Sequence, residues 1–194
     1  MPKGYVIARI DVTDPERYAR YTAVTPALAA RHGGRFIVRG GRFEAKEGTA
    51  RARNAVIEFP DYASALAFYD DPGLPRRAAP CPRGVRARAD HRRGRGGSLM
   101  PAYWIAHVEV TDEARYGEYA RRATAPITAH GGRFLARGGE HRQLEGNDRA
   151  RNVVIEFPDL AAAEACYNSP AYREALTFAR DSSVRDVVIV EGVA

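Results

Sequence analysis

The sequence predicts an α+β fold made of two ferredoxin-like modules of βαββαβ order, each with an antiparallel sheet covered by helices on one face. Three observations support this fold class. The chain repeats itself: Tyr5–Asp14 returns as Tyr103–Asp112 and Arg51–Asp61 returns as Arg149–Asp159, so equivalent residues are 98 positions apart. Each repeat contains alternating strand patterns, and these are interleaved with capped helical stretches. Because the period is that of a small domain, the repeat indicates a tandem duplication.

The first elements are clearest in the second repeat. Residues 102–110 alternate, with Trp104, Ala106, Val108 and Val110 on one face, which is typical of a half-buried strand. Asp112 supplies an N-cap for a helix that runs to His130. The glycines that follow, at 131 and 132, suit a left-handed C-terminal cap.

The remaining elements complete the βαββαβ order. Residues 133–137 form a short strand that is broken by two glycines and can resume as far as Leu144. Residues 153–157 form a third strand, and Pro158 and Asp159 end it and cap a helix over 160–168. A further helical stretch begins at Pro170 and runs to about Arg180, and the last strand covers 187–191.

The repeat divides the chain into residues 1–72, a linker at 73–99 and a second, complete module at 100–194. The match ends after Pro72, so the first module lacks its C-terminal part. Eight arginines and one aspartate lie within 73–99, so the net charge of the linker alone is higher than the +6 of the whole chain. If the codons of this segment are read one nucleotide later, they can encode a sequence that resembles the strand at 187–193. We therefore favour a frameshift that joined two adjacent genes; the alternative is a diverged arginine-rich linker.

The face of the sheet away from the helices is expected to be partly polar. It should carry Tyr103, Ile105, His107, Arg137, Asn152, Val154 and Glu156. This mixture is too apolar for free exposure to water and too polar for a closed core. A module of this kind is expected to form a homodimer or to pair with its tandem copy, with a pocket between sheet and helices.

Several motifs resemble one bacterial family. They are the Gly-Gly-Arg-Phe-Leu-Ala-Arg-Gly-Gly run at 131–139, the segments at 151–158 and 166–172, and the ending at 188–192. The chain resembles the family known as domain of unknown function 1330, within the dimeric α/β-barrel superfamily, over 101–193 and about 1–72. The resemblance implies a ferredoxin-like fold and a dimeric barrel. Superfamily relatives include cofactor-independent monooxygenases, muconolactone isomerases, chlorite-dismutase-like haem proteins and binding modules, so it implies no single activity.

The first candidate site pairs Arg137 with Glu156, and their counterparts in the first repeat are Arg39 and Glu58. An arginine–carboxylate pair that faces a cavity can hold an anionic substrate, or it can tune the carboxylate as a general base. The alternative is a structural ion pair on the sheet face or across a dimer.

The second candidate is the strand entrance at Arg151 and Asn152, with counterparts Arg53 and Asn54. The planar fork of arginine suits carboxylates and phosphates, so this edge can read an anion. The alternative is a solvated strand end that pairs with nearby acidic residues.

Other candidates are histidine and tyrosine side chains. His130, with its counterpart His32, is either an acid–base at the mouth of the pocket or a helix-terminal histidine favoured by the helix dipole. Tyr119, Tyr167 and Tyr172 can line an aromatic pocket, although helix aromatics at such positions are more often core. Tyr103, on the strand at 102–110, is a further candidate for substrate binding. We expect no metal, because no set of His, Asp and Glu residues has the spacing of metal ligands. We also expect no cofactor, because no phosphate-binding glycine loop follows a strand into a helix.

Three functions remain open. The first is a protein that binds a small molecule and can also be an enzyme. In this hypothesis Arg137 and Arg151 orient an anionic or carbonyl-bearing ligand, and Glu156 or His130 serves as base. The second is a non-catalytic dimerisation module. The third, nucleic-acid binding through 76–95, ranks last. No apolar run suits a membrane span and no secretory leader is visible, so a cytoplasmic location is expected.

Overall fold

The computed structural model describes residues 2–75 and 100–193, which form two compact units. Among these residues, the first unit comprises 2–40 and 51–75 with Val193, and the second comprises 41–50 and 100–192. Residues 41–50 therefore belong to the second unit, although the repeat places them in the first module. Most of the expected linker, with its frameshift hypothesis and Cys81, lies outside the described residues.

The first unit is a three-stranded antiparallel sheet with two helices. Its strand order is β1-β4-β2. Along the chain the elements are β1 (Gly4–Ile10), α1 (Pro15–Arg31), β2 (Arg35–Arg39), β4 (Arg53–Phe59) and α2 (Tyr62–Asp70). Leu28, Phe59 and Phe68 are buried in its core.

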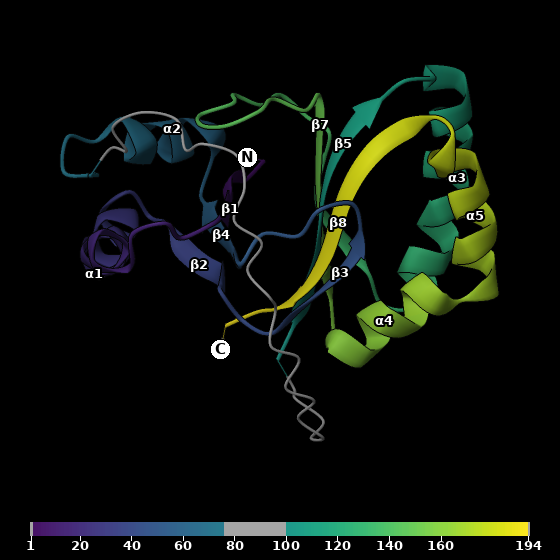
Figure 1. The fold of residues 1–194 in the computed structure, drawn as a ribbon, viewed down its shortest axis with the longest axis horizontal. Helices are drawn as coiled ribbons and strands as arrows, with labels where there is room; N and C mark the ends of the chain where they lie inside the picture. The colour runs from purple at the N-terminus through teal and green to yellow at the C-terminus, as the bar shows by residue number, and fades with distance from the viewer. Residues whose placement is uncertain (1, 76–99, 194) are drawn as a thin grey trace. The chain divides into compact units, whose positions relative to one another are not determined.

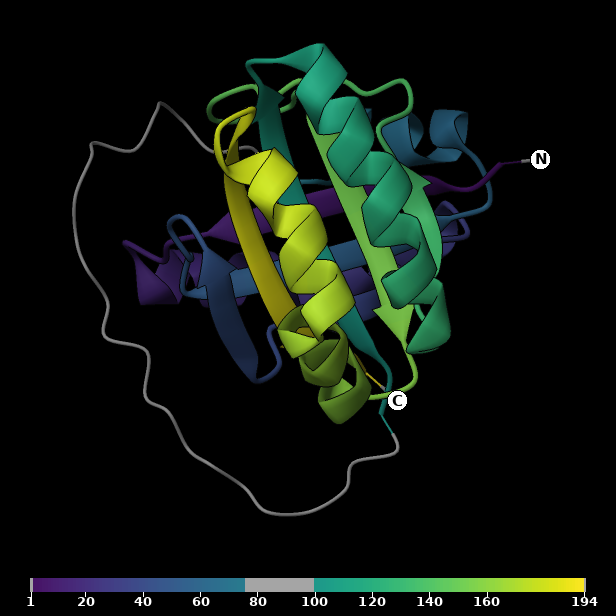
Figure 2. The same ribbon diagram turned by 90° about the vertical axis from the view of Figure 1, so that its right-hand side faces the viewer.

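The second unit is a five-stranded antiparallel sheet with helices on one face (Figure 1). Its strand order is β3-β8-β5-β7-β6. The elements are β3 (Phe43–Glu47), β5 (Ala102–Val110), α3 (Glu113–Ala129), β6 (Arg133–Arg137), β7 (Arg151–Phe157), α4 (Leu160–Asn168), α5 (Pro170–Arg180) and β8 (Ser183–Glu191). Figure 2 shows α3 and α5 side by side across this sheet, with β3 at its edge beside β8. The predicted α+β class is confirmed.

The ends of the helices follow the predicted signals. The Asp112 carboxylate accepts a hydrogen bond from the backbone N of Arg115 at 3.0 Å, as an N-cap does. Asp159 caps α4 in the same way, at 2.7 Å from the backbone N of Ala162. Gly131 follows α3 with a φ of 78°, a left-handed conformation that glycine adopts without strain. These caps therefore mark where α3 and α4 begin and where α3 ends.

A β-bulge in β6 reverses the side on which Arg137 lies. The pairing of β6 with β7 shifts between Phe134 and Ala136, so Arg137 pairs with Val153 and not with a residue on the face of Glu156. An extra residue in one strand turns the following side chains to the other face. The expectation that Arg137 and Glu156 share a face is therefore wrong, and Arg137 lies on the helix-covered side.

The segment 139–150 also differs from expectation. The sequence allowed the strand to resume as far as Leu144, but these residues form no strand and most of them are exposed. Their counterparts in the first repeat do form a strand, β3, because they pair with the edge of β8. In the described part of the chain, no helix is both long and apolar enough to cross a membrane.

Candidate functional site

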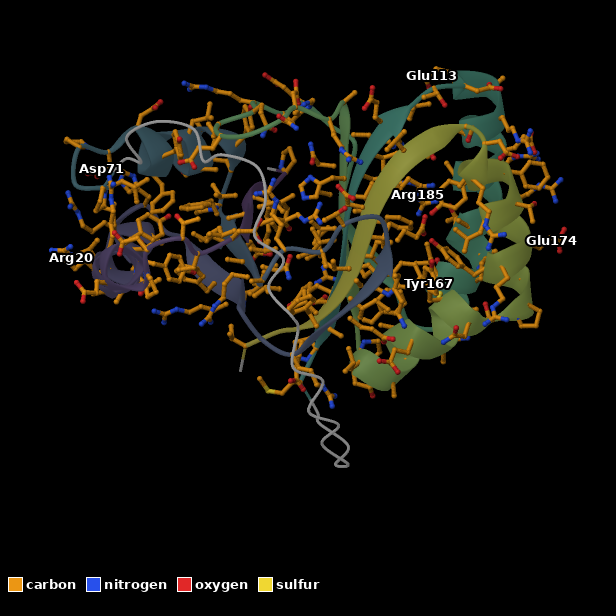
Figure 3. All side chains as sticks on the ribbon, viewed as in Figure 1. Arg20, Asp71, Glu113, Tyr167, Glu174 and Arg185 are labelled. Carbon is orange, nitrogen blue, oxygen red and sulfur yellow. The ribbon has the colours of Figure 1, made fainter. Side chains whose placement is uncertain are left out.

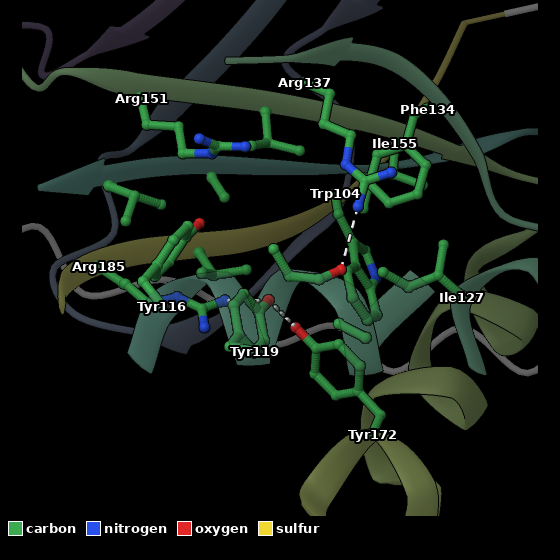
Figure 4. A pocket seen from close by; sticks show the side chains of 16 residues that line it. Trp104, Tyr116, Tyr119, Ile127, Phe134, Arg137, Arg151, Ile155, Tyr172 and Arg185 are labelled. Carbon is green, nitrogen blue, oxygen red and sulfur yellow. Dashed lines mark hydrogen bonds between the residues drawn. The ribbon is translucent and has the colours of Figure 1, made fainter. Parts of the chain in front are cut away.

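A cavity lies between the sheet and the helices of the second unit (Figure 4). Its volume is about 40 Å³, which is room for a few water molecules or a small polar ligand. The walls come from β5, α3, β6, β7, α5 and β8 and are mostly apolar or aromatic. Its polar and aromatic lining includes Trp104, Tyr119, Arg137, Arg151, Tyr172 and Arg185.

Arg185 is the central charge of this cavity. Its side chain is only 4% exposed and projects from β8 into the layer between sheet and helices (Figure 3). Nη2 donates a hydrogen bond to the hydroxyl of Tyr119 at 2.9 Å and lies 3.3 Å from a carboxylate oxygen of Glu47. Nε and Nη1 are also buried, but neither has a hydrogen-bond partner among the described residues. Unused buried donors are costly, so a polar occupant of the cavity would stabilise this arrangement.

Two tyrosine hydroxyls extend the polar chain that begins at Arg185. The hydroxyls of Tyr119 and Tyr172 lie 2.9 Å apart (Figure 4). Burial raises the pKa of Tyr172 well above its ordinary value, so this phenol stays protonated. Burial alone would lower the pKa of Arg185, but the neighbouring Tyr119, Tyr172 and Glu47 outweigh it and raise that pKa. The guanidinium is therefore a permanent positive charge.

Trp104 adds a further buried donor. Its indole Nε1 has no hydrogen-bond partner within the described part of the chain. The ring packs against Phe157 and Tyr172, with centroids 4.9 and 5.0 Å away. Trp104 is also the only tryptophan of the sequence, so its fluorescence reports on this cavity.

Two of the predicted arginines line the cavity. Arg137 donates from Nη2 to the Thr124 hydroxyl at 2.7 Å and to the Ala120 carbonyl oxygen at 3.0 Å. The guanidinium of Arg151 stacks over the ring of Tyr116, 5.4 Å from its centroid. The structure thus places Arg137, Arg151 and Tyr119, three of the candidate binding residues, around the same cavity.

Glu156 and Tyr103 lie on the opposite face of the sheet. The Tyr103 hydroxyl donates to Glu156 at 3.1 Å, and Nε of Arg133 donates to the same carboxylate at 3.1 Å. The carboxylate therefore pairs with Arg133 and not with Arg137. Glu156 borders an open depression of about 260 Å³ with Pro101, Gly131, Arg133, Phe157 and Pro158.

Glu58 repeats this arrangement in the first unit. It accepts hydrogen bonds from Tyr5 at 3.2 Å, from Arg35 at 3.0 Å and from Lys3 at 2.6 Å. Burial would raise the pKa of Glu58, but the hydrogen bonds and charges of Lys3 and Arg35 lower it below its ordinary value. A carboxylate held in this way stays ionised, which suits a structural ion pair.

The asparagines and the remaining arginines have different surroundings in the two repeats. The Asn152 amide oxygen lies 2.6 Å from Nδ1 of His107. The Asn54 side chain is buried and has no hydrogen-bond partner among the described residues. Arg39 lies over the ring of Phe36, as Arg137 lies over Phe134, and Arg53 is exposed at the start of β4. The equivalent residues of the two repeats therefore make similar but not identical contacts.

The two candidate histidines lie at helix ends. His130 is the C-cap of α3, with Nδ1 2.8 Å from the Pro126 carbonyl oxygen. His32 is the C-cap of α1, with Nε2 2.9 Å from Asp71. This hydrogen bond is the main reason why the pKa of Asp71 is lowered. His130 does not line the cavity, and its position is that of a helix-terminal residue.

The described residues form neither a metal centre nor a reactive thiol. Over residues 2–75 and 100–193, no group of three or more His, Cys, Asp or Glu side chains could hold a metal ion. Cys166 is fully buried, and burial raises its pKa to about 12, so the thiol is inert.

The sequence reasoning missed Arg185 and Glu47. The alternation of side chains along β8 could have identified Arg185. It lies two residues before Val187 and four before Ile189, so it shares their core face if the strand begins at or before Arg185. Nothing in the sequence distinguishes Glu47 from its counterpart Glu145, because both precede a glycine in equivalent turns.

Comparisons with known proteins give a family but no activity. The sequence model of the family described as "Domain of unknown function (DUF1330)" matches residues 3–79 and 101–193. A comparison with curated proteins found no match. A protein of unknown function from Rhodopseudomonas palustris is similar in structure, with 18% identity and a TM-score of 0.44 over 50% of this chain and 85% of that one. A "putative monooxygenase" from Lactobacillus acidophilus NCFM has 13% identity and a TM-score of 0.48 over 98% of this chain and 93% of that one.

Proposed function

The chain belongs to this DUF1330 family, whose name assigns no activity, and we propose that its second unit binds a small anionic or carbonyl-bearing molecule between sheet and helices. The observation that carries this proposal is the buried guanidinium of Arg185. It lines the cavity with Nε and Nη1 unused by any described residue. An oxygen acceptor in the cavity would satisfy these donors.

The charges around the cavity favour an anion. Arg137, Arg151 and Arg185 all line it, whereas the carboxylate nearest to Arg185 is that of Glu47. An arginine that is removed from water attracts an anion more strongly than an exposed one, because the local dielectric is low. The Trp104 indole adds a neutral donor that suits a carboxylate or a carbonyl oxygen equally well.

The size of the cavity limits the ligand. A volume of about 40 Å³ is far below the roughly 300–1,000 Å³ of pockets that hold drug-sized molecules. The ligand is therefore a molecule of a few non-hydrogen atoms, unless the layer between sheet and helices opens. Formate, acetate and acetamide are suitable probes.

The test uses the full chain and the fluorescence of Trp104. We expect formate or acetate to change this fluorescence saturably at constant ionic strength, with chloride as the replacement anion. Arg185→Lys keeps the charge but removes the donors on Nε and Nη1, so it should weaken binding at least about tenfold. Arg133→Lys, on the opposite face of the sheet, is the matched control and should bind like the wild type. Absence of any saturable change in the wild type would contradict the proposal.

A non-catalytic, self-associating module is the second candidate. The small cavity favours a module without catalysis. On the opposite face of the sheet, Tyr103 and Arg133 donate hydrogen bonds to Glu156, which lowers the cost of burying these polar groups against a second copy. An enzyme of the monooxygenase or isomerase kind would in addition turn over its ligand. Sedimentation velocity over a range of protein concentrations tests self-association. A concentration-dependent dimer without any response of Trp104 to the probes would favour this candidate.

A further inference from the structure

Strand β3 carries a carboxylate from the first half of the sequence to the cavity of the second unit. It pairs antiparallel with the outer edge of β8, and Phe43 lies opposite Val190. Both of its ends are held: the backbone N of Glu191 donates to the Arg42 carbonyl oxygen at 2.8 Å, and the backbone N of Thr49 donates to Asp186 at 2.8 Å. The position of Glu47 is therefore set by the fold.

A β-bulge turns Glu47 toward the cavity side of the sheet. Ala45 pairs with Val188 and Glu47 pairs with Val187, so the register shifts by one residue between them. Val187 and Arg185 both line the cavity, which identifies that side as the helix-covered face. Without the bulge, Ala45 and Glu47 would lie on the same face, because side chains alternate along a strand.

Glu47 forms an ion pair with Arg185. One carboxylate oxygen lies 3.3 Å from Nη2 of Arg185 and accepts a hydrogen bond from the Tyr167 hydroxyl at 3.2 Å. Figure 3 shows Arg185 and Tyr167 between the sheet and the helices of this unit. Glu47 itself does not line the cavity. It acts through Arg185, both by orienting the guanidinium and by offsetting its charge.

We propose that Glu47 is the positioning and specificity-determining residue of this cavity, and that its ligand is a small monocarboxylate. The inference rests on the proposed function. A monocarboxylate has one charged end for Arg185 and one apolar end for the walls formed by Trp104 and Ile155. An anion with oxygens on every side would place some of them against apolar walls without a donor. Because Glu47 offsets part of the charge of Arg185, it limits the affinity for any anion.

The test compares acetate with acetamide, its neutral counterpart, by the fluorescence of Trp104 in the full chain. In Glu47→Gln, the amide oxygen can still accept the hydrogen bond from Tyr167 beside Nη2 of Arg185, but the negative charge is gone. We expect acetate to bind about tenfold more tightly than to the wild type, and acetamide to bind as before. A residue with a merely structural role would change both affinities together, and not that of acetate alone.

The sequence repeat supplies a matched control. Glu145 is the counterpart of Glu47 but lies in the exposed segment 139–150, so Glu145→Gln should leave both affinities unchanged. Glu47→Asp keeps the charge and should not tighten acetate binding. If Glu47→Gln does not fold, Glu47→Asn, which is also neutral and keeps an amide oxygen as acceptor, makes the same prediction. If the wild type binds acetate and the uncharged variants bind it equally or more weakly, the inference is overturned while the proposed function stands. If no probe binds the wild type, both are overturned.

Discussion

The turn after β3 offers the sharpest test of how this strand is held on the second unit. Gly48 follows β3 with a φ of 68°, in the left-handed region. A Cβ at this position would overlap the carbonyl oxygen of Arg185 and the carboxylate of Asp186, and it would lie 3.1 Å from the Asp186 Cα. Gly48→Ala should therefore strain the backbone and push the turn away from β8.

The magnitude follows from comparison with Gly146, its counterpart in the second repeat. Gly146 also has a positive φ, 79°, but a Cβ there would meet nothing within 4 Å. Gly146→Ala should lower the free energy of unfolding by about 1 kcal/mol, the usual cost of a left-handed conformation for alanine. Gly48→Ala carries the same cost plus that of an overpacked contact, about 2 kcal/mol. The expected total is about 3 kcal/mol.

The assay is urea denaturation of the full chain, followed by the fluorescence of Trp104. This tryptophan belongs to the second unit, so the transition it reports is the one that β3 should affect. Circular dichroism of both variants before denaturation checks that each is folded. Equal losses of stability for Gly48→Ala and Gly146→Ala, or a larger loss for the latter, would refute the claim that the turn is docked against β8.

Three further predictions concern the two units separately. Because its basic partners keep the pKa of Glu58 below the ordinary 4.5, its stabilising effect is present above pH 4.5 and is lost as the pH falls through the lowered pKa. Glu58→Gln should therefore flatten the decline in stability below pH 4.5, and an unchanged profile in acid denaturation would contradict this. In a Cys81→Ser background, Cys166 should react with a thiol reagent only after unfolding, and fast labelling of the native protein would count against the inert thiol. Asp159→Ala should cost about 1 kcal/mol in urea denaturation by removing the N-cap of α4, and a cost near zero would contradict that role.

Local signals in the sequence were sufficient for the order of the elements. The alternation over 102–110, the N-caps at Asp112 and Asp159 and the glycines after α3 all describe the structure correctly. These signals depend only on residues that are close in the sequence, so they can be recognised without knowledge of the tertiary fold. The sequence pattern predicts the start of β8 four residues too late, at Val187 instead of Ser183. That error removed Arg185 from the strand and hence from the candidate site.

The faces of the strands were predicted less well, because strict alternation ignores bulges. Arg137 follows the bulge in β6 and Glu47 follows the bulge in β3, and each points to the helix-covered face for that reason. A bulge has no dependable sequence signature, since it is favoured by the packing on both sides of the strand. Arg137 and Arg151 nevertheless both line the cavity between sheet and helices, because both side chains lie on the helix-covered face; their role in binding a ligand stays a prediction.

The segments 43–47 and 141–145 show that a strand depends on an available edge as much as on its own sequence. Both segments follow a pair of glycines and end at a Glu-Gly turn, yet only 43–47 forms a strand, on the outer edge of β8. A strand gains its stability from the hydrogen bonds and side-chain contacts of its neighbours, so a segment without an acceptor edge stays irregular. The edge of β8 accepts one such segment, and residues 43–47 occupy it. The two repeats are therefore not equivalent: Glu47 of the first repeat forms an ion pair with Arg185 beside the cavity, whereas Glu145 of the second repeat stays in an exposed segment.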